Sequence, residues 1–509
     1  MFKKILIANR GEIALRVIRT CRELGIQTVA VYSEADRLSL PVRFAEEAYL
    51  LGPAPARESY LDIDKILAVA KKAGVEAIHP GYGFLSENAD FAERCQEEGI
   101  VFIGPSPKAM AASGDKLAAR ELAKKAKVPS VPGLLAVLQD AVEAKREAAL
   151  MKYPVILKAR AGGGGKGMRR VNRVEEMESA FRLASSEAAQ SFRDGSLYME
   201  KYIENPHHVE LQILGDKKGN IICLGERECS VQRRHQKIIE ESPSPFISEK
   251  TRQAMIKAAI QLGKAAGYYG AGTVECLVDK NQKFYFLEVN ARLQVEHPVT
   301  EMVTGLDLVR AQIEIAAGGK LSEIVGANPR VRPSGKGRHM GLPLHGYAME
   351  CRIYAEDPDH DFLPSPGKIT HLRNPEGPGV RVDSAVYPGC EISVYYDPMI
   401  AKLITWGRTR QEAIQRMRRA LKEYEIIGIK TNISFHKRIL EHPDFLKGRY
   451  DTGWIERNIF ELKRERRQGL EEIAKIAVEI HQKTSLLKEE RSEGAESRWK
   501  TISLQEGLR

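Results

Sequence analysis

The sequence predicts an α/β protein that begins with a parallel β-sheet covered by helices. Apolar runs such as Ile5–Ala8 and Thr28–Tyr32 alternate with longer segments of helical spacing such as Glu12–Leu24. Regular alternation of strands and helices is typical of a parallel sheet with helices on both faces. Residues 200–300 and 330–407 contain many strand-like runs and few helical ones, so the later part of the chain is predicted to be β-rich.

The elements of the first 112 residues follow from apolar spacing and from glycine stops. In Glu12–Leu24 the apolar residues fall on one helical stripe, and Gly25 is a plausible C-terminal cap. The other elements expected here are a helix through Ile63–Ala70 that stops at Gly74, and strands at Val75–Ile78 and Ile100–Ile103. The loop His79–Phe84 follows a strand, at the edge where such sheets carry ligands.

A glycine run, Gly162–Gly167, separates two predicted strands, Tyr153–Ala159 and Met168–Val171. Its letters match Gly-x-Gly-x-x-Gly, but a strand rather than a helix follows it, and Met168 stands where a P-loop has lysine. We therefore predict a flexible hairpin whose bare N–H groups close over phosphates. A mobile surface loop without a ligand is the alternative.

The remaining predicted helices are few. They lie at Lys116–Lys127, at Thr251–Ala266 and, as a basic amphipathic helix, at Arg410–Leu421. Asn172, with Glu175 three residues later, is predicted as the N-cap of one further helix. The last 50 residues are charged and helical in composition.

Length and composition restrict the class of protein. A chain of 509 residues is long enough for three or four domains. Without a run of about 20 apolar residues it is expected not to span a membrane, and its first apolar run is too short for a signal peptide. The seven cysteines are scattered without metal-ligand spacing, which indicates reduced thiols and a cytoplasmic protein. A net charge of +10 without an aromatic-interleaved basic patch favours anionic substrates such as nucleotides over nucleic acid.

Polar groups occupy every second position from Glu288 to Glu296, in the order Glu-Val-Asn-Ala-Arg-Leu-Gln-Val-Glu. Alternate side chains of a strand share a face, and the carboxylate and amide oxygens of Glu288 and Asn290 suit Mg²⁺. Arg292 beside them suits a planar anion. Nine extended residues would span roughly 26 Å, which is too long for a compact site. We therefore expect the strand to end near Asn290 and the chain to fold back. A charged strand face with salt bridges is the alternative.

Other polar groups of the same region complete a candidate site. Lys116 and Lys158 can act as point charges on phosphate oxygens, and the end of the strand before Glu200–Ile203 could present free backbone donors and acceptors to a purine. Glu275 is expected to face Glu288 across neighbouring strands and to hold Mg²⁺ with it. His208 and Glu210 share one strand face, although a lone histidine there is more often structural. Gln232–Lys237 is a dense polar run whose alternative is a solvated face.

The order of these groups resembles that of ATP-grasp ligases. It consists of Lys116, Lys158, the glycine run, Met199–Tyr202, Gln232–Lys237, Glu275 and Glu288–His297. Three strings, His79–Asn88, Gln232–Lys237 and Arg292–Glu301, are more specific. They are similar to biotin carboxylase, the ATP-using component of biotin-dependent carboxylases, and the resemblance covers residues 1 to about 455.

The resemblance implies ATP- and bicarbonate-dependent carboxylation of biotin on a separate biotin carboxyl carrier protein, through carboxyphosphate. It implies ATP contacts from Lys116, Lys158, Gly164, Gly165, His208 and His235, and an adenine site at Glu200, Lys201, Tyr202 and Ile203. It assigns Mg²⁺ (or Mn²⁺) to Glu275, Glu288 and Asn290, and bicarbonate to Lys237, Arg292, Gln294 and the backbone of Val295. Glu296 is implied as the base that activates bicarbonate, and Arg352 as the residue that stabilises the enolate of biotin.

The resemblance also implies an ATP-grasp fold in four segments. They are a Rossmann-like N-terminal domain at 1–113, an ATP-grasp domain at 114–330 with a mobile glycine-rich lid at 131–203, a β-rich C-terminal domain at 331–455 and a charged helical tail at 456–509. The chain has no Ala-Met-Lys-Met biotinylation string and no following transferase domain. We therefore expect a stand-alone subunit of an acyl-CoA or pyruvate carboxylase, whose partners are the carrier protein and a carboxyltransferase subunit.

The chain departs from the family pattern in three places. Arg160 and Ala161 replace a smaller serine and glycine before the glycine run, so we expect a stiffer and more basic lid. A segment near 322–346 is longer than in compact relatives. Arg19, Glu23 and Arg381 match positions of a bacterial homodimer contact, but Pro378 stands where an aromatic partner is expected, so the homodimer stays open.

Three questions remain open from the residues. The chain could be another ATP-grasp ligase that joins a carboxylate to an amine, or a non-catalytic scaffold subunit, although Glu275, Glu288, Arg292 and Glu296 argue against both. The final carboxyl acceptor, whether acetyl-CoA, propionyl-CoA, pyruvate or another acid, leaves no mark in the sequence. In the tail, Leu470, Ile473, Ile476, Ala477 and Ile480 recur at helical spacing, which predicts docking on a partner subunit rather than a solvated extension.

Overall fold

A computed structural model describes residues 1–160, 167–326, 344–463 and 478. Residues Met1–Arg457 form one compact unit, and Asn458–Arg509 form a second one. The predictions for Gly164, Gly165 and the apolar stripe of the tail therefore lie outside the described residues.

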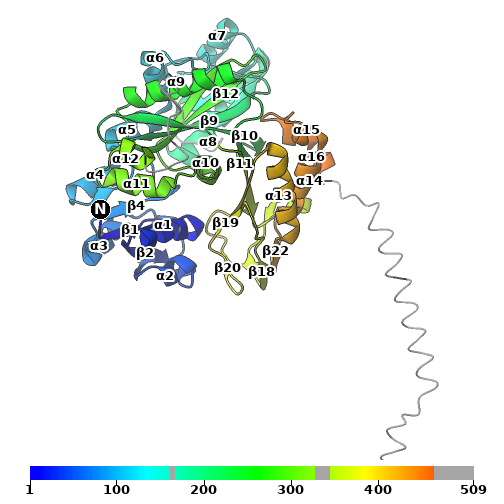
Figure 1. Cartoon of the computed structure of the whole chain (residues 1–509). Coiled ribbons are helices and arrows are strands. Elements are labelled where there is room, and N and C mark those ends of the chain that lie inside the picture. The colour runs from blue at the N-terminus through cyan, green and yellow to red at the C-terminus, as the bar shows by residue number, and fades with distance from the viewer. Residues whose placement is uncertain (161–166, 327–343, 464–477, 479–509) are drawn as a thin grey trace, which may run out of the picture. The chain divides into compact units, whose positions relative to one another are not determined.

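The chain begins with a five-stranded parallel sheet in the order β3-β2-β1-β4-β5, drawn in blue in Figure 1. Its strands are β1 (Lys4–Ile7), β2 (Gln27–Ser33), β3 (Glu47–Gly52), β4 (Ala77–His79) and β5 (Val101–Phe102). The helices between them are α1 (Gly11–Glu23), α2 (Leu40–Phe44), α3 (Ile63–Ala73) and α4 (Ala89–Glu97). The predicted alternation is confirmed, and the α3 stop at Gly74 is a left-handed residue with φ 62°, a conformation that glycine adopts without strain.

The central element is an eight-stranded antiparallel sheet in the order β13-β12-β9-β10-β11-β14-β21-β19. Its strands are β9 (His207–Gly215), β10 (Ile221–Arg233), β11 (Gln236–Ser242), β12 (Gly270–Val278), β13 (Phe284–Asn290), β14 (Tyr347–Tyr354), β19 (Val380–Ser384) and β21 (Met399–Gly407). Strands from both sides of residue 330 thus share one sheet. This continuity brings side chains of β14 and β21 beside those of β10 and β11.

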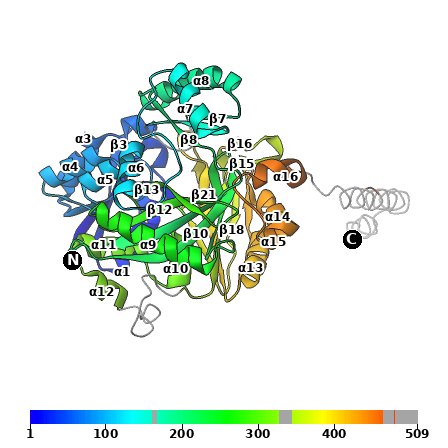
Figure 2. The same ribbon diagram turned by 90° about the horizontal axis from the view of Figure 1, so that it is seen from above.

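The predicted lid region contains its own three-stranded sheet, β7-β6-β8, formed by β6 (Val155–Ala159), β7 (Met168–Val171) and β8 (Leu197–Lys201). The two strands that flank the glycine run pair antiparallel, as predicted for a hairpin. Helices α7 (Ala141–Met151) and α8 (Met177–Phe192) cover the sheet and share a small apolar core with it. In Figure 2 these elements stand together at one edge of the unit.

The other described elements are helices, short 3-10 turns and short strand pairs. The helices are α5 (Pro107–Gly114), α6 (Lys116–Lys125), α9 (Glu249–Ala265), α10 (His297–Thr304), α11 (Leu308–Ala316), α12 (Leu321–Gly326), α13 (Arg410–Glu423), α14 (Ile433–Glu441), α15 (Pro443–Leu446) and α16 (Trp454–Lys463), with short 3-10 turns at Glu34–Asp36, Ala56–Glu58, Val174–Glu176 and Pro358–His360. Three strand pairs complete the described part: β15 (Glu356–Asp357) with β16 (Leu363–Pro364), β17 (Gly367–Lys368) with β20 (Glu391–Ile392), and β18 (His371–Arg373) with β22 (Glu425–Ile427).

Helix packing positions the loop on which the candidate site is built. α9 packs against β9 and β10, whereas α10 packs against β10, β11, β14 and β21. α10 begins at His297, directly after the polar row predicted from the sequence. Its apolar residues Val299 and Val303 pack on Ala348 and Ile404 of the sheet. The polar row is therefore held between the end of β13 and a buried helix.

One local prediction is wrong. Asn172 does not cap a helix: a 3-10 turn over Val174–Glu176 follows first, and α8 begins only at Met177. The side chain of Glu176 instead reaches back and accepts a hydrogen bond of 2.9 Å from the backbone N–H of Asn172. The expected partner Glu175 is thus replaced by its neighbour Glu176, and the contact precedes a 3-10 turn rather than a regular helix.

The predictions about cysteines and about membrane-spanning segments can be compared with the described residues. The seven cysteines are all free thiols in the described residues, and six of them are buried. Among the same residues, no helix combines the length and the apolar character that crossing a membrane requires.

Candidate active site

The predicted pair of carboxylates faces the same position from two adjacent strands. Glu275 of β12 lies opposite Glu288 of β13 in the antiparallel register, and β13 ends at Asn290 as predicted. Burial and the nearby charge of Glu275 raise the pKa of Glu288, although Lys116 and Lys158 oppose the shift. A cation between these carboxylates would relieve that repulsion.

Lys237 of β11 is the centre of the charge network. Its Nζ atom lies 2.5 Å from Glu210, 2.9 Å from Glu275 and 2.6 Å from Glu296. Burial alone would lower the pKa of Lys237, but the three carboxylates raise it well above its ordinary value. The lysine is therefore a permanent cation at this point.

Lys237 also decides which carboxylates remain available to a metal ion. Ligand atoms of His208, Glu210 and Glu275 lie within 4.8 Å of one another, a grouping that the sequence did not single out as a metal site. Lys237 already bridges Glu210 and Glu275, and His208 Nε2 lies 3.0 Å from the other oxygen of Glu275. Both side-chain oxygens of Glu275 are thus already contacted in this structure, one by Lys237 and the other by His208.

Glu296 is a buried carboxylate held between two cations. One oxygen contacts Lys237, and the other accepts a hydrogen bond of 2.9 Å from Nη2 of Arg352. The side chain is fully buried, which would raise its pKa, but Lys237, Arg352 and Arg227 together hold the pKa well below its ordinary value. Glu296 is thus ionised in this arrangement, and its role as the base that activates bicarbonate stays a prediction.

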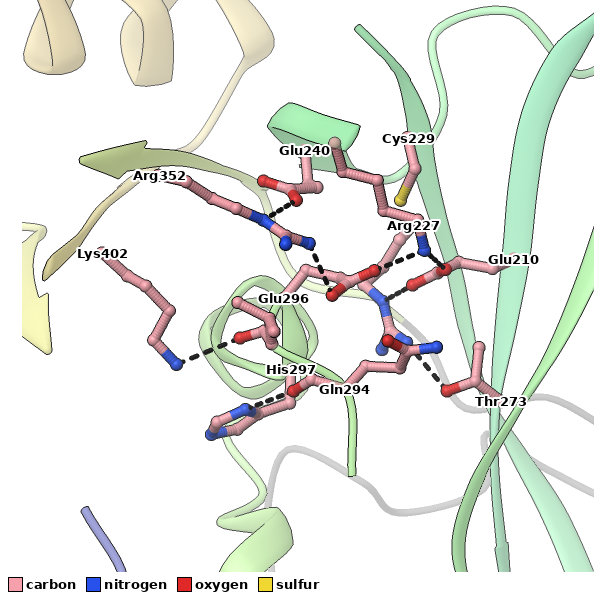
Figure 3. A network of polar contacts seen from close by, with 12 residues as sticks. Glu210, Arg227, Cys229, Glu240, Thr273, Gln294, Glu296, His297, Arg352 and Lys402 are labelled. Carbon is pink, nitrogen blue, oxygen red and sulfur yellow. Dashed lines mark hydrogen bonds and ion pairs between the residues drawn. The ribbon is translucent and has the colours of Figure 1, made fainter. Parts of the chain in front are cut away.

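Second contacts fix the two cations in place, as Figure 3 shows. Arg352 Nε donates to Glu240 at 2.5 Å. Glu210 is held by Arg227, which also donates to Thr300 at 2.9 Å and to Thr273 at 3.0 Å. Because Arg227 is fully buried and bound through all three of its nitrogens, it orients Glu210 toward Lys237.

Arg292 and Gln294 lie on the loop between β13 and α10, beside Glu296 in the sequence. Arg292 donates to Glu87 at 2.9 Å and to the side-chain oxygens of Gln294 at 3.1 Å and Asn290 at 3.2 Å. Gln294 Nε2 donates to Glu275 at 3.2 Å. The loop thereby links the predicted anion-binding groups to the carboxylate pair.

A cavity of about 500 Å³ adjoins this loop. Its wall includes Arg292, Val295 and Arg352, together with Tyr82 of the glycine-proline loop and Tyr396. Tyr396 is held by Arg10, whose guanidinium lies 4.0 Å from the ring centre. An aromatic wall with guanidinium groups at one end suits a flat organic molecule that carries polar carbonyl or amide groups.

The residues predicted to contact a nucleotide lie between the lid sheet and α6. Lys158 Nζ lies 2.6 Å from Glu200, whose other oxygen is paired with Arg120 at 2.5 Å. Lys116, the first residue of α6, donates to the carbonyl of Ala159 at 3.4 Å, and burial lowers its pKa. Both lysines lie close enough to Glu288 to affect its pKa, so the predicted phosphate and metal groups converge.

The idea of free backbone donors at the end of β8 is wrong for two residues. The N–H of Lys201 donates to Pro132 at 2.7 Å, and the N–H of Tyr202 donates to Pro154 at 3.2 Å. Ile203 follows directly after them in the chain. The predicted His235 lies at the tip of the β10–β11 hairpin, with φ 65° and an exposed side chain.

Sequence reasoning missed the supporting residues Arg227, Glu240, Glu87 and Arg120. Glu87 stands within the string His79–Asn88 that carried the resemblance, and its charge was the one available signal. The other three lie in segments whose charges could equally face solvent. The predicted homodimer residues Arg19, Glu23 and Arg381 line a separate cavity of about 700 Å³, where Arg381 pairs with Glu301 at 2.7 Å.

Family models match three consecutive stretches of the chain. The biotin carboxylase N-terminal domain matches residues 1–110, the ATP-binding domain of the carbamoyl-phosphate synthase L chain matches 115–324, and the biotin carboxylase C-terminal domain matches 350–457.

Named relatives align over most of the chain. Biotin carboxylase 1 of Bacillus subtilis is 52% identical over 457 residues, which are 90% of this chain and 98% of the relative. A pyruvate carboxylase subunit of Methanothermobacter thermautotrophicus is also 52% identical over 457 residues, which cover 90% of each chain.

Solved structures share the fold. The biotin carboxylase of Campylobacter jejuni, in a β-γ-ATP complex, is 48% identical with a TM-score of 0.84 over 90% of this chain and 99% of that one. The biotin carboxylase domain dimer of Hydrogenobacter thermophilus 2-oxoglutarate carboxylase, with MgADP, ADP and bicarbonate, is 47% identical with a TM-score of 0.85 over 91% and 99%. Given this identity over nine-tenths of the chain and the shared fold, the chain belongs to the biotin carboxylase family.

Proposed function

We propose that this chain catalyses the ATP- and bicarbonate-dependent carboxylation of biotin on a separate carrier protein. The observation that carries the proposal is the position of Glu296, an ionised and buried carboxylate between Lys237 and Arg352. It lies beside the loop of Arg292 and Gln294 and next to the cavity of about 500 Å³. A base, an anion-binding group and a cavity for a flat molecule are thus adjacent.

The first step is the activation of bicarbonate. Lys237, Arg292, Gln294 and the backbone of Val295 bind the anion, and Glu296 takes its remaining proton. A bicarbonate oxygen then attacks the γ-phosphorus of ATP, the bond to the bridging oxygen of ADP breaks, and carboxyphosphate and ADP form. Lys116 and Lys158 offset the charge that spreads over the transferring phosphoryl group.

The donor set also fits a divalent cation. Glu275 and Glu288 face each other, the side-chain oxygen of Asn290 points toward Arg292, and the three together are oxygen ligands of the kind that Mg²⁺ or Mn²⁺ takes. The ion would neutralise phosphate charge in the nucleotide complex. His208 and His235, with the segment Glu200–Ile203, are proposed to contact the rest of ATP.

The second step transfers the carboxyl group to biotin. The C–O bond between the carboxyl carbon and phosphate of carboxyphosphate breaks, the departing phosphate takes the proton of a biotin ring nitrogen, and this nitrogen forms the new C–N bond to the carboxyl carbon. We assign Arg352 to the stabilisation of the enolate-like oxygen of biotin, because its guanidinium lines the cavity and is held by Glu240 and Glu296. Exclusion of water protects carboxyphosphate during this step.

The partners follow from the reaction. Biotin must arrive on a carrier protein, and a carboxyltransferase subunit must take the carboxyl group from it. Relatives bear the names of pyruvate and propionyl-CoA carboxylase chains, and one solved domain is a dimer, which supports a multi-subunit enzyme and a homodimer for this chain. The free thiols support a cytoplasmic location. We propose domain boundaries near 113, 330 and 455.

One experiment separates this proposal from the alternatives. ADP release is measured with ATP and Mg²⁺ alone, with bicarbonate, and with bicarbonate plus biotin. The proposal expects release that depends on bicarbonate and increases with biotin. Release that requires an amine and a different carboxylate would favour another ATP-grasp ligase, and absence of release under all conditions would favour a scaffold.

A further inference from the structure

Lys402 of β21 is a completely buried lysine with no place in the reaction described above. Its side chain has 0% exposure, and its Nζ atom donates a hydrogen bond of 3.0 Å to the carbonyl oxygen of Val295. Figure 3 shows Lys402 and Arg352 reaching toward this loop from the neighbouring strands β21 and β14, where the two residues lie opposite each other in the antiparallel register. A buried ammonium group is costly unless it is paired, so its position requires an explanation.

The charge partners of Lys402 come from distant parts of the chain. Glu12, at the beginning of α1, lies 3.2 Å from Nζ, and Asp383 of β19 lies 3.8 Å from it. The ring centre of Tyr82 lies 5.5 Å away. Glu12 is the nearer of the two carboxylates, although burial raises its pKa to about 7. Asp383 is shared with Arg381, from which it accepts hydrogen bonds of 2.7 and 2.8 Å, and Arg381 and Lys402 together lower its pKa. These contacts anchor the ammonium group independently of the loop.

The hydrogen bond from Lys402 is made to the peptide group that joins Val295 to Glu296. The carbonyl of Val295 and the N–H of Glu296 belong to the same planar unit. Fixing this plane restricts rotation about ψ of Val295 and φ of Glu296, which together aim the Glu296 side chain. The loop around it is held by few regular backbone bonds, because Ala291–Glu296 lies between the end of β13 and the start of α10.

We propose that Lys402 is a positioning residue for bicarbonate activation: it holds the Val295–Glu296 peptide so that the backbone of Val295 and the carboxylate of Glu296 meet the anion together. This inference rests on the proposed function. Lys402 contacts the carbonyl oxygen of Val295 and acts on the anion only through this peptide. The charges that keep Glu296 ionised are those of Lys237, Arg352 and Arg227, and the contribution of Lys402 is geometric.

The test uses the full chain and a charge-balanced variant. Lys402→Met keeps the length of the side chain but removes its donor and its charge. The double variant Lys402→Met/Glu12→Gln also removes the counter-charge, and Glu12→Gln alone is the matched control that retains the bond to Val295. Thermal unfolding establishes that each variant folds, and steady-state ADP release gives KM for bicarbonate and for ATP.

The proposal expects kcat/KM for bicarbonate to fall at least tenfold in the double variant, while KM for ATP changes less than twofold. Glu12→Gln should keep bicarbonate kinetics within twofold of the unmodified chain. Bicarbonate kinetics of the folded double variant equal to those of the control would overturn the proposal, and so would parallel losses for ATP and bicarbonate. If the double variant does not fold at 25 °C, Lys402 is structural and the proposal is wrong. If the unmodified chain shows no bicarbonate-dependent ADP release, the proposed function itself is contradicted.

Discussion

The charge network predicts a distinctive phenotype for Lys237→Met. Methionine preserves the volume and length of the lysine side chain but removes a cation that lies within 2.9 Å of Glu210, Glu275 and Glu296. Two separate effects follow. Bicarbonate loses a charged contact, and Glu296 loses one of the cations that keep it ionised.

The size of the first effect and the direction of the second follow from the geometry. A hydrogen bond to a charged group contributes about 1.5–3 kcal/mol, so KM for bicarbonate should rise by roughly 10- to 150-fold. Lys237 is also the strongest of the cations that hold down the pKa of Glu296, so its loss should raise that pKa and move the acid limb of the pH profile upward. Arg352 stays in contact with Glu296 and keeps part of the effect.

The assay is ADP release as a function of bicarbonate at several pH values between 6 and 9. Three buried carboxylates without their lysine would destabilise the fold, so Lys237→Met/Glu210→Gln, which removes one of these charges, is measured beside the single variant. Glu210 is chosen because it is not assigned a contact to bicarbonate. Lys250→Met, at an exposed lysine of α9, is the matched control. A folded variant with unchanged KM for bicarbonate and an unchanged acid limb would refute the reasoning.

Four further outcomes are expected. Glu288→Gln should lower ATP cleavage by about 100-fold or more without unfolding the chain, since it removes one charge from the cation site; wild-type-like turnover in the ADP assay would contradict the metal assignment. Arg352→Ala should impair carboxylation of biotin more than bicarbonate-dependent ATP hydrolysis, and equal losses in the two assays would count against its role. Burial lowers the pKa of His436 to about 4 in the folded chain, whereas the unfolded chain binds the same proton near pH 6.5, so the free energy of unfolding decreases as pH falls from 6.5 toward 4. At pH 5.5 this decrease is about 1.4 kcal/mol. Denaturant unfolding of His436→Gln should therefore show a weaker decline in stability between pH 7.5 and 5.5 than the unmodified chain. Deletion of residues 460–509 should retain activity with free biotin but weaken assembly with the partner subunits, and unchanged co-elution would make the tail a solvated extension.

Acid sensitivity at His436 has a simple structural cause. Its Nε2 atom lies 2.8 Å from the carbonyl oxygen of Arg352 and therefore donates, while Nδ1 has no hydrogen-bond partner within the described residues. Protonation would bury an N–H group without an acceptor. Equal declines with pH in the unmodified chain and in the variant would show that other groups cause the acid sensitivity.

Local pattern was sufficient for the elements and for part of the site. The polar row from Glu288 to Glu296 predicted the end of β13 near Asn290, because nine extended residues would be too long for a compact site. Glu275 was expected to face Glu288 across neighbouring strands, and the two lie opposite each other. Local pattern also predicted the hairpin around the glycine run. It failed at Asn172, where a 3-10 turn precedes the helix, and at Lys201 and Tyr202, whose N–H groups are taken by proline carbonyls of other segments.

By itself, then, the sequence determined the α/β class, the order of the elements and the residues with the right chemistry. Only the tertiary structure decided which of them touch. Arg352 meets Glu240 from 112 positions away, and Lys402 meets Val295 from 107, because the eight-stranded sheet continues across residue 330 and brings β14 and β21 beside β11. A repeat of two indicates which face of a strand a side chain occupies, but the neighbour on that face depends on sheet order. Long-range packing sets that order, so Glu296, its two cations and Lys402 come together only in the folded chain.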